Sequence, residues 1–166
     1  MKVAVKDANV LIDLVEGDLL GLWFRLGIET HVPDLVLEEI KSPEQRRLVD
    51  AMVEAGNLKV GTFDPTQVPR IESFRREYRV SLADAAAIFL AEQLHAALLS
   101  GDKLVRKVGQ SLNLDVKGLL WVFDELVQRE LLDAADAGQR LDRVVEAGAR
   151  LPTDEVQARL RKWRAG

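Results

Sequence analysis

The stretch that decides the fold is Val3-Ala4-Val5-Lys6-Asp7-Ala8-Asn9-Val10-Leu11, in which a short apolar run ends at an aspartate. Residues 3–6 predict a strand, and the apolar positions between residues 9 and 15 have the spacing of a helix. The same succession of strand and helix recurs along most of the chain. Strands that alternate with helices favour a parallel sheet covered on both faces.

The other expected elements follow the same pattern. Strands are predicted at 30–32, 58–60, 96–99 and 115–117, with helices at 19–26, 35–40, 43–55, 69–78, 82–95 and 103–111. After Leu119 only helices are predicted, at about 119–132, 134–148 and 153–163. We therefore expect a three-layer α/β/α fold with a short central parallel sheet over residues 1–130, and an all-helical extension over residues 131–166 that packs on it.

The composition limits the kinds of site that the chain can build. Its 166 residues are 48% apolar and 30% charged, as in an ordinary soluble domain. There is no cysteine, which excludes disulfides and thiolate metal sites, and the two histidines, His31 and His95, leave little for a zinc site. A bound metal would therefore be a hard cation held by oxygen, Mg²⁺ or Mn²⁺.

The charge pattern bears on location and partners. The first fifteen residues are apolar but carry Lys2, Lys6, Asp7 and Asp13, so we expect neither a signal peptide nor a membrane span there, and a cytoplasmic protein. The net charge of −4 argues weakly against non-specific coating of nucleic acid. Arginines are clustered at 46–47, 70–79 and 159–164, and the simplest interpretation of each cluster is a solvated helix face.

Four acidic residues stand where a parallel sheet places its ligand site. Ligands bind beyond the carboxyl ends of the strands, and Asp7 and Asp102 follow the first and fourth predicted strands. Asp84 lies in the first turn of a predicted helix, and Glu39 about one and a half turns into the helix that follows the second strand. We expect these acids, from four separate segments, to converge on one pocket.

Converging carboxylates repel one another unless a cation neutralises them. A hydrated Mg²⁺ needs only a few carboxylates, together with water and a substrate phosphate. Such an ion polarises a phosphoryl oxygen and lowers the pKa of a bound water, so the expected chemistry is phosphodiester hydrolysis.

Each acid also has a purely structural interpretation. Asp7 and Asp102 could cap the helices that follow them, Ser81 and Asp84 resemble a capping box, and Glu39 could be a surface charge. Only the complete set, in order and in register with the expected fold, favours a metal site.

At these residues the chain resembles the PIN-domain ribonucleases, which include the toxins of VapBC-type toxin–antitoxin pairs. The matching stretches are residues 6–13, 33–40, 81–88 and 98–103, and the resemblance extends over residues 3 to about 117. The helical tail is similar to that of a PIN subgroup with an extended C-terminus.

The resemblance implies a PIN-like fold and a Mg²⁺- or Mn²⁺-dependent endonuclease acting on RNA. It implies that the protein is a homodimer and, in the toxin group, that it has an antitoxin partner. The residues that fall on the metal-binding acids of the family are Asp7, Glu39, Asp84 and Asp102, while Asn9 and Ser100 fall on supporting polar positions.

The sequence departs from the family pattern at two places. Ala8 stands where many members have Ser or Thr, and Leu104 and Val105 follow where a further acid could stand, which puts a fifth ligand in doubt.

Two other functions remain as alternatives. A phosphatase with an aspartyl nucleophile needs Asp-x-Asp after the first strand, and here the third position is Asn9. A non-catalytic PIN-like module for interaction or dimerisation would explain the extra helices, but unneeded buried charge is unfavourable. In the tail we expect Trp121, Phe123 and Leu126 to be packing residues and not a platform for bases.

Overall fold

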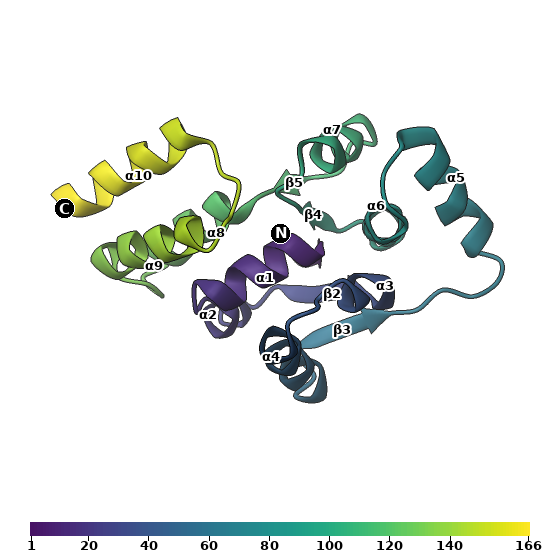
Figure 1. Ribbon diagram of the computed structural model, residues 1–166, viewed down its shortest axis with the longest axis horizontal. Coiled ribbons are helices and arrows are strands. Elements are labelled where there is room, and N and C mark those ends of the chain that lie inside the picture. Colours follow the sequence, from purple (N-terminus) through teal and green to yellow (C-terminus); the bar gives the residue numbers. More distant parts are fainter.

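The computed structural model describes residues 1–166 and has a five-stranded, fully parallel sheet at its centre, in the order β3-β2-β1-β4-β5 (Figure 1). The strands are β1 (Val3–Lys6), β2 (Glu29–Pro33), β3 (Leu58–Gly61), β4 (Ala97–Leu99) and β5 (Val116–Lys117). The predicted succession of strands and helices is confirmed. The first strand is central, with Val5 paired to His31 on one side and to Leu98 on the other.

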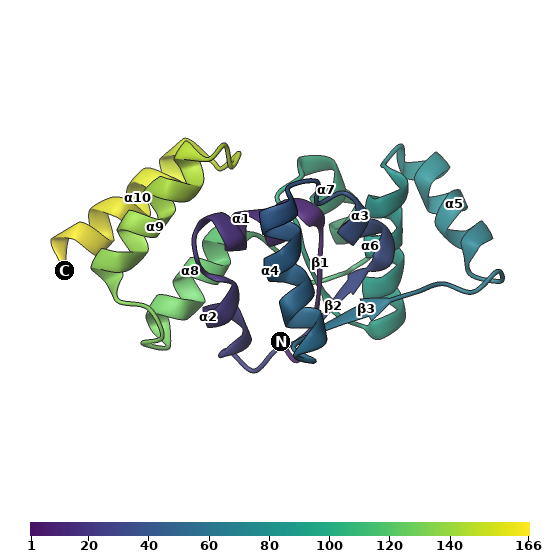
Figure 2. The ribbon, with the colours of Figure 1, turned by 60° about the horizontal axis from the view of Figure 1, so that its bottom comes forward.

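Ten helices surround this sheet and extend from it. They are α1 (Ala8–Glu16), α2 (Leu20–Phe24), α3 (Asp34–Glu38), α4 (Pro43–Glu54), α5 (Val68–Tyr78), α6 (Leu82–Leu94), α7 (Lys103–Ser111), α8 (Leu119–Gln128), α9 (Ala134–Glu146) and α10 (Thr153–Ala165). In one layer, α4 packs on β3 and on α1. In the other, α6 contacts β1, β2 and β4, α7 contacts β5, and α5 packs outside α6 (Figures 1 and 2). The three-layer α/β/α fold is therefore confirmed. No helix is both long and apolar enough to span a bilayer.

Helix α6 packs closely on the centre of the sheet because its first turns are rich in alanine. Ala83 and Ala85–Ala87 are all buried, so the backbone of the helix can approach the strands. Beyond it, Phe74 of α5 lies edge-on to Phe89 of α6, with ring centroids 6.3 Å apart. This contact holds α5 against the outside of the domain.

Residues beyond the sheet form three helices, as the sequence predicts. Phe123 and Leu126 of α8 are fully buried, which confirms that they are packing residues. The ring of Phe123 lies 5.9 Å from that of Trp163 in α10, and Arg159 of α10 binds Asp124 of α8 through two nitrogens, with its shortest contact at 2.6 Å. This pairing departs from the expectation of a solvated arginine face at 159–164. The division of the chain near residue 130 stays a prediction.

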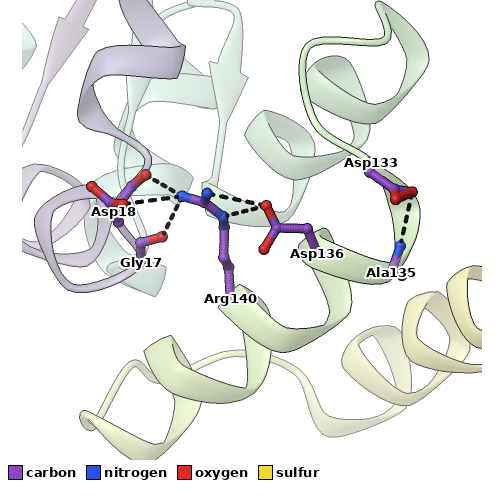
Figure 3. A network of polar contacts seen from close by, with 6 residues as sticks. All are labelled: Gly17, Asp18, Asp133, Ala135, Asp136 and Arg140. Carbon is purple, nitrogen blue, oxygen red and sulfur yellow. Dashed lines mark hydrogen bonds and ion pairs between the residues drawn. The ribbon is translucent and has the colours of Figure 1, made fainter.

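Helix α9 is attached to the first helices of the chain through Arg140 (Figure 3). The guanidinium group donates to the backbone carbonyls of Gly17 and Asp18, just beyond α1, and is held by Asp136 one turn away at 3.0 Å. Asp18 adopts a left-handed backbone conformation, with φ of 52°, which turns the chain toward α2. Arg140 is only 17% exposed, so its loss would leave these carbonyls poorly hydrated.

We predict that Arg140→Ala lowers the free energy of unfolding by about 2 kcal/mol, because charged hydrogen bonds to partly buried carbonyls are removed. Urea denaturation followed by circular dichroism measures the change. Arg143→Ala is the matched control: it lies on the same helix, is exposed and makes no ion pair, so its effect should stay within about 0.5 kcal/mol. Equal midpoints for the two variants would contradict the role assigned to Arg140.

Candidate metal centre

The candidate site lies where the order of the strands reverses. β1 is followed along the chain by its neighbour β2, whereas its other neighbour, β4, is reached only after β3, α5 and α6. The Asp7 amide donates to the Leu99 carbonyl at 3.1 Å, so the ends of β1 and β4 are joined at this point. Asp7 and Asp102 each start the helix that follows their strand. A crevice at such a reversal is the usual ligand site of an open α/β sheet.

Asp7 is the most deeply buried of the four acids. Its side chain is the N-cap of α1 and accepts from the Val10 amide at 2.9 Å, and it also accepts a hydrogen bond from the Ser100 hydroxyl. Ser100 in turn accepts from the Asp102 amide at 3.1 Å. Burial raises the pKa of Asp7 to about 6, even though the hydrogen bonds from Ser100 and Val10 lower it. Ser100 therefore links the ends of β1 and β4.

Asp84 is the common neighbour of the other acids. It forms a capping box with Ser81, whose hydroxyl accepts from the Asp84 amide at 3.0 Å while the Asp84 carboxylate accepts from Ser81. Burial raises the pKa of Asp84, and the charge of Asp102 raises it further. The charge of Asp84 in turn raises the pKa of Asp7 and that of Glu39, for which burial is again the larger cause. The four acids thus share one electrostatic environment.

The positions of the four residues differ in detail from the prediction. Glu39 is not inside its helix: α3 ends at Glu38, and Glu39 is the C-cap. Glu39 and Asp102 are exposed, Asp84 is half-buried, and Asp7 is 2% exposed. The four acids therefore differ in exposure, from Asp7 in the interior of the domain to Glu39 and Asp102 at the surface.

The structural and functional interpretations of these acids are compatible. Asp7 and Asp102 use Oδ1 to cap α1 and α7, at 2.9 Å in both cases. A carboxylate has two oxygens and about four acceptor positions. Capping fixes the orientation of each group and leaves the other oxygen available for a ligand.

The donor set fits a hydrated hard cation. It consists of carboxylates, the ligands that Mg²⁺ and Mn²⁺ prefer; the charge of Asp84 raises the pKa of Asp7 and of Glu39, and the charge of Asp102 raises the pKa of Asp84. No three acidic or histidine side chains are close enough to enclose an ion by themselves. Mg²⁺ commonly keeps several waters and is bound through one or two carboxylates, so the arrangement suits an open site shared with a substrate phosphate.

Two residues of this region were not predicted from the sequence. Asp13 of α1 is half-buried, and burial followed by the charge of Asp7 raises its pKa to about 7. Its place on the helix, four residues after Asn9, would have indicated that it faces the same way as Asn9. Lys6 is fully buried without a hydrogen-bond partner, its Nζ 3.3 Å from the centre of the Trp23 ring, and burial lowers its pKa. No periodicity in the sequence distinguishes Lys6 from a surface lysine.

The remaining polar candidates form no hydrogen bond with the four acids. Asn9 is exposed on α1, and its side chain makes no hydrogen bond within the protein. His31 pairs with Glu29 at 2.7 Å, and His95 is the C-cap of α6 at the other edge of the sheet. His95 lines a hollow of about 420 Å³ that contains none of the four acids.

A groove of about 910 Å³ begins at Asp102; we call it the C-terminal groove. It is lined by the start of α7, the segment from β5 into α8, and the residues that lead from α9 into α10. Trp121 packs against the core, as the sequence predicts, and is half-buried because it also lines this groove.

Comparison with known proteins identifies the family. A solved structure that is similar to this chain is the crystal structure of PAE2754 from Pyrobaculum aerophilum, with 14% sequence identity and a TM-score of 0.54 over 79% of this chain and 98% of that chain. At this identity the likeness supports the fold alone. No curated protein matches the sequence. A family model described as a PIN domain matches residues 3–165, and the chain therefore belongs to the PIN-domain family, whose members are generally nucleases.

Proposed function

We propose that this protein is a divalent-metal-dependent endoribonuclease, with Asp7, Glu39, Asp84 and Asp102 as the residues that hold Mg²⁺ or Mn²⁺. The observation that carries the proposal is the electrostatic interaction of these four acids through Asp84, at the reversal of the strand order. The ion would supply a polarised phosphoryl oxygen and a water of lowered pKa.

The residues of the chain have separate parts in this proposal. Asp7 is oriented by Val10 and Ser100, and Asp102 by the first turn of α7, so both present a fixed carboxylate to the crevice. The exposed Glu39 and Asp102 stand at the side from which a substrate enters. Ser100 is a positioning residue, since it bonds both Asp7 and the Asp102 backbone. Asn9, which falls on a supporting position of the family, is placed to act through water because its side chain is exposed.

We predict that Asp7→Asn or Asp84→Asn lowers Mn²⁺-dependent cleavage of RNA at least ~100-fold, because several kcal/mol of transition-state stabilisation by the ion would be removed. Cleavage of a labelled structured RNA, analysed on denaturing gels, measures the effect. Asp142→Asn is the matched control, since Asp142 is a carboxylate of α9 that pairs with Arg164. Undiminished cleavage by both site variants would refute the assignment.

The buried Asp7 also leads to a prediction about stability, which can be tested without measuring cleavage. In metal-free buffer the pKa of Asp7 is about 6 in the folded state, whereas an ordinary aspartate, as in the unfolded chain, has a pKa of 3.8. Stability is then lost as the pH rises from about 4 to about 6, and the loss amounts to about 3 kcal/mol above that window. Asp7→Asn keeps a good helix cap without the charge, so we expect it to melt higher than the wild type at pH 7.5 and equally near pH 3.5.

Metal binding should reverse this difference. Mn²⁺ at pH 7.5 is expected to raise the melting temperature of the wild type and to raise that of Asp7→Asn much less, because a cation offsets the ionised cluster. Calorimetric titration with Mn²⁺ provides the second readout. A wild type that binds no Mn²⁺ would instead favour the alternative, a non-catalytic PIN-like module for interaction or dimerisation.

The biological role that we propose follows from the family resemblance. The resemblance to VapC-like nucleases suggests a toxin with an antitoxin partner, a homodimer, and action in the cytoplasm. If the protein is such a toxin, its expression should arrest growth of a bacterial host, and expression of Asp84→Asn should not. Growth curves test this, and arrest by both forms at equal protein levels would contradict a toxic nuclease.

A further inference from the structure

The C-terminal groove continues from the acidic cluster along the outside of the domain. Asp102 belongs to both, and Lys103 is the next residue along the groove. The lining also includes Arg150, Leu151 and Pro152, which lead into α10. Residues of both the sheet domain and the C-terminal helices therefore line the groove. Contacts of α10 with α8, and of α9 with the turn after α1 (Figure 3), attach these helices to the rest of the molecule.

The lining of the groove is basic although the protein is acidic. It contains five basic and two acidic side chains, whereas the whole chain has a net charge of −4: Lys103, Arg106, Lys117, Arg150 and Arg159 against Asp102 and Glu155. Positive charge concentrated in a cleft attracts an anionic ligand even when the net charge is negative.

These basic groups differ in their freedom to bind a ligand. Arg106 donates to the Ser100 carbonyl at 3.0 Å, and Arg159 is committed to Asp124. Lys103 and Arg150 are exposed and make no ion pair, so they are free to bind. They belong to two different segments of the lining, the start of α7 and the residues that lead into α10.

Trp121 adds an aromatic surface to the lining of the groove. The protein has three tryptophans, and Trp23 and Trp163 are buried, at 0% and 5% exposure. Trp121 is half-buried, lies edge-on to Trp23, and has the Lys117 ammonium 5.8 Å from its ring centre. An aromatic ring among basic side chains in a groove is the arrangement that binds single-stranded nucleic acid, with phosphates on the cations and a base stacked on the ring.

We propose that the C-terminal groove binds the single-stranded stretch of RNA next to the phosphate at the acidic cluster, with Lys103 and Arg150 on its phosphates and Trp121 stacked on a base. That the bound RNA is also the substrate rests on the proposed nuclease function. The C-terminal helices then take part in substrate binding, since α9 and α10 bring Arg150 to the site. A peptide of a partner protein suits the groove less well, because the two free groups are both cations and Leu104 is the only large apolar residue of the lining that is exposed.

Binding can be measured without cleavage by fluorescence anisotropy in EDTA, with a labelled single-stranded RNA of about 12 nucleotides. We expect Lys103→Ala combined with Arg150→Ala to weaken binding about tenfold and to reduce the slope of log K against log salt by about 1.4, or about 0.7 for each phosphate that is no longer neutralised. Arg76→Ala combined with Arg143→Ala is the matched control, since both arginines are exposed, unpaired and outside the groove. The control variant removes two positive charges, as the groove variant does.

Trp121 gives an independent test of the same groove. Trp121→Ala is expected to weaken binding about tenfold without changing the salt slope, and Trp121→Phe to retain most of the affinity, because stacking needs a ring but no charge. Bound RNA should also protect tryptophan fluorescence of the wild type from acrylamide, an effect that Trp121→Phe removes. Melting curves verify that each variant is folded.

The results separate this inference from the proposed function. Equal loss of affinity in the two double variants, or no loss in the groove variant, would overturn the groove as the RNA site. Selective loss in the groove variant supports it, even if the protein cleaves no RNA in Mn²⁺ and the nuclease proposal fails. If instead the protein cleaves RNA in Mn²⁺ but its RNA affinity does not depend on the groove, the nuclease proposal stands and the groove is not the RNA site.

Discussion

The position of β1 determines where this molecule can bind a ligand. The strand is hydrogen-bonded to parallel neighbours on both sides, and the chain connects it to them in different ways: directly to β2, and only after β3, α5 and α6 to β4. Right-handed crossovers then place the connecting helices on opposite faces, and a crevice remains above the end of β1. Asp7 lies at this end, 2% exposed, and its burial disfavours the ionised form that a cation requires. The proposed binding of a cation and the stability of the fold therefore make opposite demands on the charge of Asp7, as is common at functional sites.

The acids near the crevice also serve the fold. Asp7, Asp102 and the Ser81–Asp84 pair cap three helices that diverge from the crevice. Capping immobilises a carboxylate without using all its acceptor positions, and helix N-termini favour negative charge. Groups that are held in this way need little further ordering when a ligand binds. The same double use explains why a substitution by asparagine separates the two roles, since asparagine still caps a helix but does not carry the charge.

Much of this architecture could be predicted from the sequence, because both the strands and the acids follow local rules. Short apolar runs that alternate with helical spacings indicated the succession of the sheet elements. Asp7 and Asp102 follow two of these runs, Glu39 and Asp84 belong to helical segments, and the four acids share one electrostatic environment. Other features depend on contacts between distant residues and left no local signal. Burial of Lys6 depends on Trp23, and the exposure of Trp121 depends on where α10 returns, so neither follows from spacing along the chain. The C-terminal groove could not be predicted for the same reason: its walls are residues 101–106, 116–121 and 150–159.

The attachment of Arg140 to the turn after α1 has a consequence for the order of events during synthesis. The bonded residues are separated by 122 and 123 positions in the chain, and β1 acquires its neighbour β4 only when residues 97–99 are available. A chain that emerges from the ribosome N-terminus first can pair β1 with β2 early, but it must hold the other side of β1 unpaired until β4 has been made. The crevice does not exist in the nascent chain before Asp102 has been released. The fold therefore brings the residues of the proposed site together only in the later part of synthesis, and α9 is attached to the turn after α1 later still.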